Sequence, residues 1–266
     1  MEPFLKWAGG KRWLVSKQTE LLPRQEEYNN YLEPFIGGGA VFFHLQPENG
    51  VISDLNSDLI NAYKIVRDNW RELNYLLTEY NALHSSEFYY NIRASRPEAL
   101  LDQAARFIYL NRTCWNGLYR VNKKGEFNVP IGTKTKVILE SDNFEHISNL
   151  LSDIQIENND FEVTINRAEE GDFLFIDPPY TVKHNLNGFV KYNENIFSWD
   201  DQVRLRDSII RAKDRGAYVL VLNADHSSIK DLYNGLGEMT ALNRASVIAG
   251  NANARGTYSE LAIKCW

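Results

Sequence analysis

Four consecutive residues, Asp177-Pro178-Pro179-Tyr180, combine a carboxylate, two rigid prolines and an aromatic ring directly after the apolar segment Phe173-Leu174-Phe175-Ile176. The prolines fix the backbone angle φ and have no N–H, so the carbonyl of Pro178 can point outward as an acceptor. The Asp177 carboxylate adds a second acceptor, and the Tyr180 ring adds a stacking face. Such a set can hold a flat ring that carries an amine. For these four residues alone, a strand that ends in a Pro-Pro turn capped by Asp177 is an equally good interpretation.

Glycines and an acidic residue stand at two other predicted strand ends. Residues 31–35 form a predicted short strand, Gly37-Gly38-Gly39 a tight turn, residues 40–45 a helix, and residues 50–53 a second strand that ends at Asp54. Ligands of open α/β sheets bind beyond the carboxyl ends of the strands, and an acid after the second strand suits a ribose diol. The spacing is not Gly-x-Gly-x-x-Gly, and the loop holds no basic residue. A neutral or cationic adenosine compound therefore fits better than a dinucleotide, with a plain tight turn as the alternative.

The elements that position these residues indicate an α/β sheet interrupted by helices. Apolar residues spaced by three and four predict helix from Leu59 to Leu83, whereas residues 113–136 have little periodicity and indicate an exposed loop or hairpin. Further helices are predicted near 86–94, 97–111, 143–151 and 200–215, and further strands at 154–157, 173–176 and 218–222. We therefore expect a catalytic sheet domain of residues 1–56 and 138–266, and a mostly helical insertion at 57–137 with a basic hairpin at about 112–136.

Length and composition are those of one large domain, or of one domain that carries an insertion: 266 residues, 44% hydrophobic and 24% charged. No apolar run approaches the roughly 20 residues that span a bilayer, and the N-terminus lacks the order of a signal peptide. The two cysteines, Cys114 and Cys265, are far apart and make neither a zinc cluster nor a disulfide framework. These features predict a cytoplasmic protein.

The net charge of −6 argues weakly against a polyanion partner, but the charge is unevenly distributed. The segment 112–136 holds six basic residues and one acidic residue, and the first 24 residues hold five basic and two acidic residues. Two basic patches on an acidic protein can still bind DNA, and a solvated charged loop is the alternative. The basic residues of the first patch are Arg112, Arg120, Lys123, Lys124, Lys134 and Lys136.

Four blocks, in order along the chain, resemble the Dam family of DNA adenine methyltransferases. They are Phe4-Leu5-Lys6-Trp7-Ala8-Gly9-Gly10-Lys11, Glu33-Pro34-Phe35-Ile36-Gly37-Gly38-Gly39, Asp54-Leu55-Asn56-Ser57-Asp58-Leu59 and Asp177-Pro178-Pro179-Tyr180. The segments 111–120 (Asn-Arg-Thr-Cys-Trp-Asn-Gly-Leu-Tyr-Arg) and 125–130 (Gly-Glu-Phe-Asn-Val-Pro) resemble the family's target-recognition hairpin. The resemblance covers nearly the whole chain, from about residue 4 onward, and the common order of the blocks makes chance a poor explanation.

The resemblance implies a Rossmann-like, S-adenosylmethionine-dependent methyltransferase fold, with the cofactor bound in the sheet domain. Asp54 is expected to accept the ribose hydroxyls, and Asp160 and Phe161 to contact the adenine of the cofactor. Ordinary core for Trp7 and an exposed helix-start charge for Lys11 are the structural alternatives. The expected cofactor-binding residues are Trp7, Lys11, Phe35, Gly37, Asp54, Asp160, Phe161 and Asp177.

The same resemblance implies that the amine belongs to adenine and that Asp177, Pro178 and Tyr180 are catalytic. The exocyclic nitrogen of adenine is a poor nucleophile because its lone pair is delocalised into the ring. Acceptors from Asp177 and Pro178 against its two hydrogens would favour a tetrahedral nitrogen with its lone pair aimed outward, while Tyr180 stacks on the ring. Because the cofactor supplies an electrophilic methyl group, no metal, covalent intermediate or histidine base is expected.

A base inside a duplex cannot reach such a pocket, so the target adenine is expected to be flipped out of the helix. By resemblance, Trp115 and Asn116 would wedge into the duplex, and Arg120 would make a bidentate contact to guanine. Trp115 stands where tyrosine is common in the family, and Lys134 where some members have a tyrosine that contacts a base. The expected DNA-binding residues are Lys6, Arg112, Trp115, Asn116, Leu118, Arg120 and Pro130, with Leu118 and Pro130 on thymine methyls, Lys6 on a flanking guanine and Arg112 on phosphate or in solvent.

The chain is therefore predicted to be a site-specific DNA adenine-N6 methyltransferase that acts on GATC in double-stranded DNA. We expect S-adenosyl-L-methionine as cofactor, no membrane and no metal, and a monomer in a prokaryotic cytoplasm or in the cytoplasm of a phage-infected host. The alternatives are a methyltransferase of an RNA base or of a protein glutamine amide, and an inert DNA-binding homologue. The first more often has Asn at the position of Asp177 and lacks the recognition segment. The intact tetrad and glycine loop argue against the second.

Overall fold

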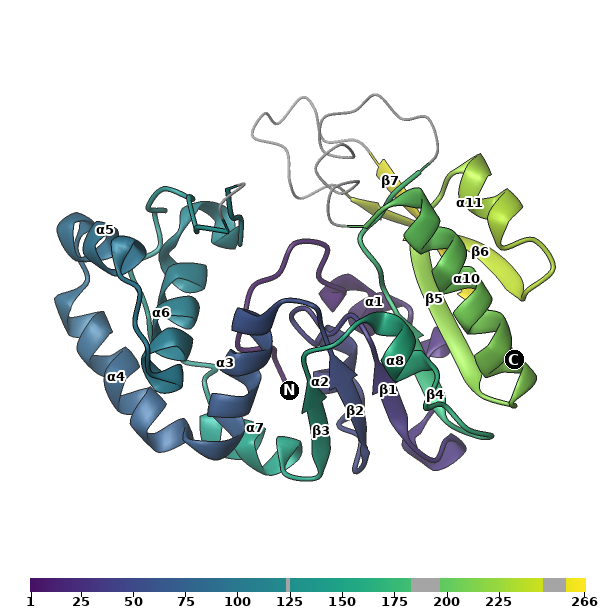
Figure 1. The fold of residues 1–266 in the computed structure, drawn as a ribbon, viewed down its shortest axis with the longest axis horizontal. Coiled ribbons are helices and arrows are strands. Elements are labelled where there is room, and N and C mark those ends of the chain that lie inside the picture. Colours follow the sequence, from purple (N-terminus) through teal and green to yellow (C-terminus); the bar gives the residue numbers. More distant parts are fainter. Residues whose placement is uncertain (123–124, 183–196, 246–256) are drawn as a thin grey trace. The chain divides into compact units, whose positions relative to one another are not determined.

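The computed structural model describes residues 1–122, 125–182, 197–245 and 257–266 (Figure 1). Lys123 and Lys124, which belong to the first basic patch, lie outside the described residues. The chain divides into two compact units. The first comprises Met1–Val15 and Ile36–Asn158, and the second comprises Ser16–Phe35 and Asn159–Trp266. Within the described ranges, no helix is long and apolar enough to cross a membrane.

The first unit is mostly helical and contains one pair of parallel strands. Strand β2 (Gly50–Ser53) pairs with β3 (Ile154–Glu157), so that Ile52 lies opposite Ile156. Helix α1 (Arg12–Lys17) crosses the boundary between the units. The other helices of this unit are α2 (Ala40–Leu45), α3 (Ser57–Asp68), α4 (Trp70–Leu83), α5 (Ser86–Ala94), α6 (Leu100–Thr113) and α7 (Phe144–Leu151), with the 3₁₀ turn η3 (Trp115–Gly117).

The second unit is built on a mixed sheet. Its strand order is β1-β4-β5-β7-β6, in which β1, β4 and β5 are parallel and β7 and β6 are antiparallel to their neighbours. The strands are β1 (Tyr31–Glu33), β4 (Phe173–Ile176), β5 (Tyr218–Ala224), β6 (Glu238–Ala245) and β7 (Thr257–Lys264). The helices are η1 (Thr19–Leu21), η2 (Gln25–Glu27), α8 (Phe161–Ile165), α10 (Trp199–Asp214) and α11 (Ser227–Leu232).

Apolar side chains of β4, β5, β7 and α10 pack into one core within the second unit. Leu174 and Ile176 of β4 are fully buried together with Val219 of β5 and Ile209 of α10. Helix α10 runs along β5 in Figure 1, so the helix covers the strand that follows it in sequence. Because the core encloses β4, the chain is firmly held up to Ile176, the residue before the segment Asp177-Pro178-Pro179-Tyr180.

The α/β class expected from the sequence is confirmed, and strands β2, β3 and β4 occupy the predicted residues. One expected feature differs. The single helix predicted from Leu59 to Leu83 is two helices, because Asn69 leaves the helical conformation (φ −134°, ψ 36°) between α3 and α4. The two compact units also divide the chain differently from the domain boundaries expected from the sequence, which stay a proposal.

Candidate active site and recognition hairpin

The tetrad Asp177-Pro178-Pro179-Tyr180 leaves the carboxyl end of β4, whose four residues are all buried. Asp177 and Tyr180 are half-buried, and Pro178 is buried. The hydroxyl of Tyr180 donates a hydrogen bond of 2.7 Å to Oε2 of Glu260, a buried residue of β7. The aromatic ring of the tetrad is therefore tethered at its far end by a carboxylate.

An aromatic surface lies at the start of α8 in the same unit. The rings of Phe35 and Phe161 are stacked, with centroids 5.4 Å apart and planes inclined by 25°. Both rings contact Phe197, at 5.7 and 5.6 Å. Asp160 is the N-cap of α8 and accepts the amide of Glu162 at 3.0 Å. Two of the expected cofactor-binding residues, Phe35 and Phe161, thus lie together, and Asp160 precedes Phe161 in the chain.

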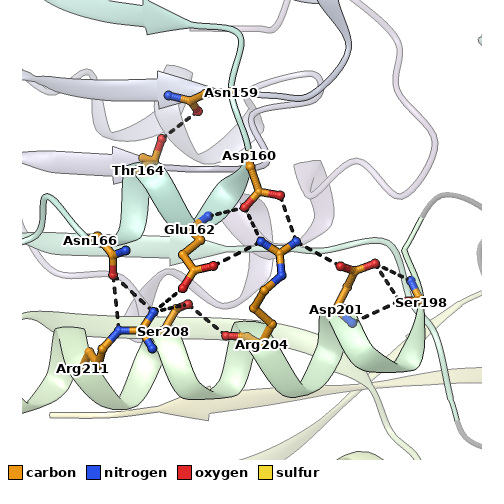
Figure 2. A network of polar contacts seen from close by, with 10 residues as sticks. All are labelled: Asn159, Asp160, Glu162, Thr164, Asn166, Ser198, Asp201, Arg204, Ser208 and Arg211. Carbon is orange, nitrogen blue, oxygen red and sulfur yellow. Dashed lines mark hydrogen bonds and ion pairs between the residues drawn. The ribbon is translucent and has the colours of Figure 1, made fainter.

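Arg204 of α10 organises this carboxylate, as Figure 2 shows. Its two terminal nitrogens donate to the two oxygens of Asp160 at 2.6 and 2.9 Å, and its guanidinium lies 4.2 Å from the centroid of the Phe161 ring. Glu162 and Asp201 accept further hydrogen bonds from it, at 3.2 and 3.0 Å. Burial opposes the ionisation of Asp160, but Arg204 and the Glu162 amide outweigh it, so the pKa of Asp160 lies below its usual value.

The glycine loop of the first unit closes onto Asp54, which is half-buried after β2. Gly37 N–H donates to Oδ2 of Asp54 at 3.2 Å, and Asn56 N–H donates to Oδ1 at 3.0 Å. Burial raises the pKa of Asp54, although these amides favour its charged form. Gly37 and Gly39 have φ of +45° and +68°, the left-handed region in which glycine is favoured. Sequence and backbone geometry therefore agree on a tight turn that presents an acid.

Trp7 packs against this loop. A Cβ atom at Gly37 would lie 2.6 Å from Cδ1 of the Trp7 indole, so only glycine permits the contact. Lys11 is 4% exposed, and its ammonium donates to the carbonyl of Gly9 at 2.6 Å. The alternative that Lys11 is an exposed helix-start charge is therefore wrong. The N-terminal block and the glycine loop form one cluster in the first unit.

The turn after α6 presents Trp115 to solvent, with 53% of the residue exposed. Asn116 adopts the left-handed conformation (φ 57°, ψ 13°), which is uncommon for a residue other than glycine. Gly117 packs on the Lys6 side chain, and a Cβ there would lie 2.8 Å from Cδ of Lys6. Burial, and then the charge of Lys134, lower the pKa of Lys6. Three of the expected DNA-binding residues, Lys6, Trp115 and Asn116, thus lie together.

A short hairpin follows this turn. Val121 and Phe127 form an antiparallel bridge, and Asn128 N–H donates to the carbonyl of Arg120 at 3.2 Å. The exposed Arg120 donates from Nε to Oδ1 of Asn128 at 2.9 Å. Of the two expected thymine contacts, Leu118 is half-buried and Pro130 is exposed.

Arg112 requires a correction, because it was expected to contact phosphate or solvent. It is 2% exposed, and its terminal nitrogens donate to both oxygens of Asp142 at 2.6 and 2.8 Å. They also donate to the carbonyls of Val137 and Phe4, at 2.6 and 2.9 Å. Arg112 is therefore a structural residue that ties the N-terminal block to the segment after the hairpin. The sequence did not indicate this burial, because Arg112 lies within a stretch of other basic residues.

The structure adds three residues that sequence reasoning missed: Glu260, Arg204 and Tyr119. Tyr119 stacks on Trp7 and donates from its hydroxyl to Oδ2 of Asp58 at 2.7 Å. Asp58 belongs to the block that begins at Asp54, and this was the one feature of the sequence that could have indicated a partner for Tyr119. No group of three or more His, Cys, Asp or Glu side chains suited to a metal ion occurs among the residues that the structure describes. Cys114 and Cys265 are buried free thiols.

Comparisons with known proteins show the family of this chain. Residues 7–247 match the family described as D12 class N6 adenine-specific DNA methyltransferase. The chain is 39% identical over 276 residues to the type II methyltransferase M1.LlaDCHI of Lactococcus lactis subsp. cremoris, covering 99% of this chain and 95% of that protein. It is 33% identical over 273 residues to a DNA adenine methylase of Vibrio cholerae, covering 97% and 94%. A DNA adenine methylase of Escherichia coli is 31% identical over 267 residues, covering 97% and 93%. With its glycine loop, acidic strand end and Asp-Pro-Pro-Tyr segment, the chain belongs to the D12 class of N6 adenine-specific DNA methyltransferases.

Proposed function

We propose that this methyltransferase modifies N6 of a flipped-out adenine within GATC in double-stranded DNA. The observation that carries the proposal is the tetrad Asp177-Pro178-Pro179-Tyr180 at the carboxyl end of β4. The preference for GATC rests on the resemblance of residues 111–120 and 125–130 to the recognition hairpin of the Dam family. Relatives named DNA adenine methylase, at 31–33% identity, support adenine in DNA as the target.

Enzymes of this family use S-adenosyl-L-methionine, and the described residues fit such a molecule. In the first unit, Asp54 offers a carboxylate to a ribose diol, and the glycines of the adjoining loop let Trp7 pack directly against the backbone at Gly37. In the second unit, the partly buried ring of Phe35 offers a face to a purine, and the buried Phe161 supports that ring from behind. Asp160, which Arg204 holds through both carboxylate oxygens, stands beside Phe161 as an acceptor. When bound, the cofactor supplies an electrophilic methyl group on a sulfonium. Trp7, Lys11 and Asp177 complete the proposed binding set.

The protein's part in the reaction is to orient the adenine and exclude water. The Asp177 carboxylate and the Pro178 carbonyl accept hydrogen bonds from the two N6 hydrogens, which draws the nitrogen lone pair out of conjugation. Tyr180 covers the ring face and holds the lone pair in line for transfer. After the new N–C bond has formed, one N6 proton must leave, and Asp177 is the carboxylate nearest to it in this arrangement.

The helical segment 57–137 is proposed to bind the duplex. Trp115, exposed on a turn held by the left-handed Asn116, suits a wedge that fills the space of the flipped base. Arg120 suits a bidentate contact to guanine, Leu118 and Pro130 suit thymine methyls, and Lys6 beside the turn suits a flanking guanine. Monomeric action without a metal, in a prokaryotic or phage-infected cytoplasm, completes the proposal.

The test is transfer of tritium from labelled S-adenosylmethionine to duplexes that contain or lack GATC, at two salt concentrations. Methyladenine in the GATC duplex alone is the expected result, and its formation should weaken as salt rises because phosphate contacts are screened. Label in RNA or protein but not in DNA would contradict the proposal. Binding of the duplex without any label would favour an inert homologue. An Asp177→Ala variant should bind the duplex and transfer no methyl.

A further inference from the structure

A buried carboxylate, that of Glu260, is a feature of the second unit that the proposed chemistry leaves unused. Glu260 is 2% exposed and lies on β7 opposite Ala224, the last residue of β5. Its neighbours along the strand, Leu261, Ala262 and Ile263, are buried apolar residues. Burial of an ionisable carboxyl group is unfavourable unless hydrogen bonds satisfy its oxygens. A glutamate at this position therefore indicates a specific task.

The partner of Glu260 indicates the task. Oε2 accepts the hydroxyl proton of Tyr180 at 2.7 Å, within the range of strong O–H···O bonds to a carboxylate. Strand β5 lies between β4, which leads into the tetrad, and β7. The bond therefore joins the tetrad to β7 at the carboxyl end of β5, where the register sets Glu260 opposite Ala224.

We infer that Glu260 is a positioning residue for methyl transfer that acts through Tyr180. The inference rests on the proposed function, in which the Tyr180 ring stacks on the target adenine. A tyrosine side chain rotates about two bonds. A hydrogen bond from the hydroxyl fixes the far end of the side chain, which restricts rotation about the Cα–Cβ bond. Because the phenol O–H prefers to lie in the plane of the ring, the direction of the acceptor also favours one tilt of the ring. The tilt of the ring sets the tilt of the stacked adenine, and with it the direction of the N6 lone pair. Small errors in that direction slow an in-line transfer strongly.

The carboxylate has a second effect on the same ring. Donation of the phenol proton to an anion makes the Tyr180 ring more electron-rich, which strengthens the negative potential of its face. During transfer the N–C bond forms as the S–C bond breaks, and positive charge moves from sulfur to the adenine nitrogen. An electron-rich face against adenine stabilises that charge. Position and electrostatics therefore act in the same direction.

A double-mutant cycle tests the inference by single-turnover methylation of a GATC duplex. Glu260→Gln keeps the shape of the side chain without the charge, and Tyr180→Phe keeps the ring without the donor. Each is expected to slow transfer about tenfold, the effect of losing a hydrogen bond to a charged group. The glutamine of Glu260→Gln can still accept the hydroxyl proton but carries no charge, and the phenylalanine of Tyr180→Phe has no proton to donate. The double variant should be no slower than the slower single variant, because both changes act on the same charged hydrogen bond. Losses that multiply would overturn the inference.

The chain offers a matched control. The Tyr31 hydroxyl donates to Oε2 of Glu33 at 2.7 Å, and both residues are buried in β1, where Tyr31 lies opposite Phe173, four residues before the tetrad. Tyr31→Phe therefore removes an equivalent buried bond, and should lower the thermal unfolding midpoint as Tyr180→Phe does while leaving the transfer rate unchanged. An equal loss of rate in Tyr31→Phe would show general destabilisation and refute a role specific to Glu260.

Stacking is measured separately with a duplex that carries 2-aminopurine at the target adenine. Its fluorescence increases when the base leaves the duplex and decreases when it stacks on an aromatic ring. Glu260→Gln should give a brighter complex than the wild-type protein, and Tyr31→Phe should not. Equal brightness of Glu260→Gln and wild type would contradict the inference. A wild-type protein that forms no methyladenine would overturn the proposed function and this inference together, whereas an active wild type with multiplying losses would overturn only this inference.

Discussion

The indole of Trp7 stacks on the ring of Tyr119, with centroids 5.7 Å apart and planes inclined by 19°. Trp7 also touches the glycine loop at Gly37, and Tyr119 stands at the base of the recognition hairpin. The Tyr119 hydroxyl donates to Asp58 at 2.7 Å, and Asp58 is the second residue of α3, four residues after Asp54. Within the first unit, two rings therefore join residues expected to bind the cofactor to residues expected to bind DNA.

Replacement of Tyr119 by Leu is expected to weaken both functions. Loss of the stacked ring frees the Trp7 indole, and we expect the affinity for S-adenosylmethionine to fall about tenfold, the order of effect of a lost aromatic pair. In the wild type, the duplex and the cofactor each raise the affinity for the other by the same factor, because coupling is reciprocal. In Tyr119→Leu both factors should decrease, and by the same proportion. Calorimetric titrations of each ligand with and without the other measure this.

Tyr119→Phe is the control for that experiment. It keeps the stacked ring and removes only the bond to Asp58. We expect cofactor affinity without DNA close to wild type and a partial loss of coupling. A Tyr119→Leu variant whose coupling equals that of the wild type would show that the two rings do not link the sites.

The raised pKa of Asp54 predicts a pH dependence of cofactor binding. Burial is the main cause, against the amides of Asn56, Gly37 and Leu55. Asp54 therefore takes up a proton at a higher pH than an ordinary aspartate, whose pKa is about 4. Affinity for S-adenosylmethionine should fall as the pH decreases toward the raised pKa of Asp54, because the protonated acid is a weaker acceptor. Titrations between pH 8 and pH 5 measure the decline.

The variant Asp54→Asn tests whether Asp54 is the group that causes this pH dependence. The variant should bind the cofactor about tenfold or more weakly at pH 8, since a hydrogen bond to a charged group is lost, and its affinity should not vary with pH. A folded-state pKa above the unfolded value means that ionised Asp54 opposes folding at neutral pH. The thermal unfolding midpoint of Asp54→Asn at pH 8 should therefore equal or exceed that of wild type. A pH dependence that persists in Asp54→Asn would assign it to another group.

Local patterns predicted much of the fold, because they follow from short-range physics. The alternation of strand and glycine turn located β2 and the acid that follows it, and a continuous apolar run located the buried β4. Antiparallel β6 and β7 were missed, since polar residues such as Asn243 and Glu260 interrupt their apolar pattern. The break between α3 and α4 was missed because a single Asn carries little weight within a long periodic segment.

The site was predicted where a motif is contiguous and missed where partners are distant in sequence. The tetrad and the glycine loop are contiguous, whereas Glu260 lies 80 residues from Tyr180 and Arg204 lies 44 residues from Asp160. The sequence likewise did not indicate which charged side chains are buried. Arg112 shares its stretch with exposed basic residues, and only its place on the inner face of α6 makes it a buried ion pair.

Arg112 predicts a stability effect without a DNA effect. Arg112→Met leaves Asp142 buried without its partner and should destabilise the fold by about 3–5 kcal/mol, measured by urea unfolding. Arg112→Met combined with Asp142→Leu should recover most of that loss, because no charge then remains buried. In the combined variant the slope of log affinity for DNA against log salt should equal that of wild type. A slope smaller by about one unit would show that Arg112 contacts a phosphate of the DNA, contrary to this prediction.

Arg120 and Asn128 predict a change of sequence preference. Arg120 is exposed, and the bond from its Nε to Asn128 at 2.9 Å restrains the guanidinium without using its terminal nitrogens, which suits a bidentate guanine contact. Arg120→Lys cannot form that contact, and the ratio of methylation rates between GATC and a duplex with that guanine replaced should fall by about 5- to 150-fold, or roughly 1–3 kcal/mol. Asn128→Ala should give a smaller fall, since it only loosens Arg120. Lys136→Ala is the control. Lys136 is exposed and pairs with Glu140, so its loss should change the methylation rates of both duplexes equally and leave their ratio unchanged. An unchanged ratio in Arg120→Lys would assign the reading of that guanine to another residue.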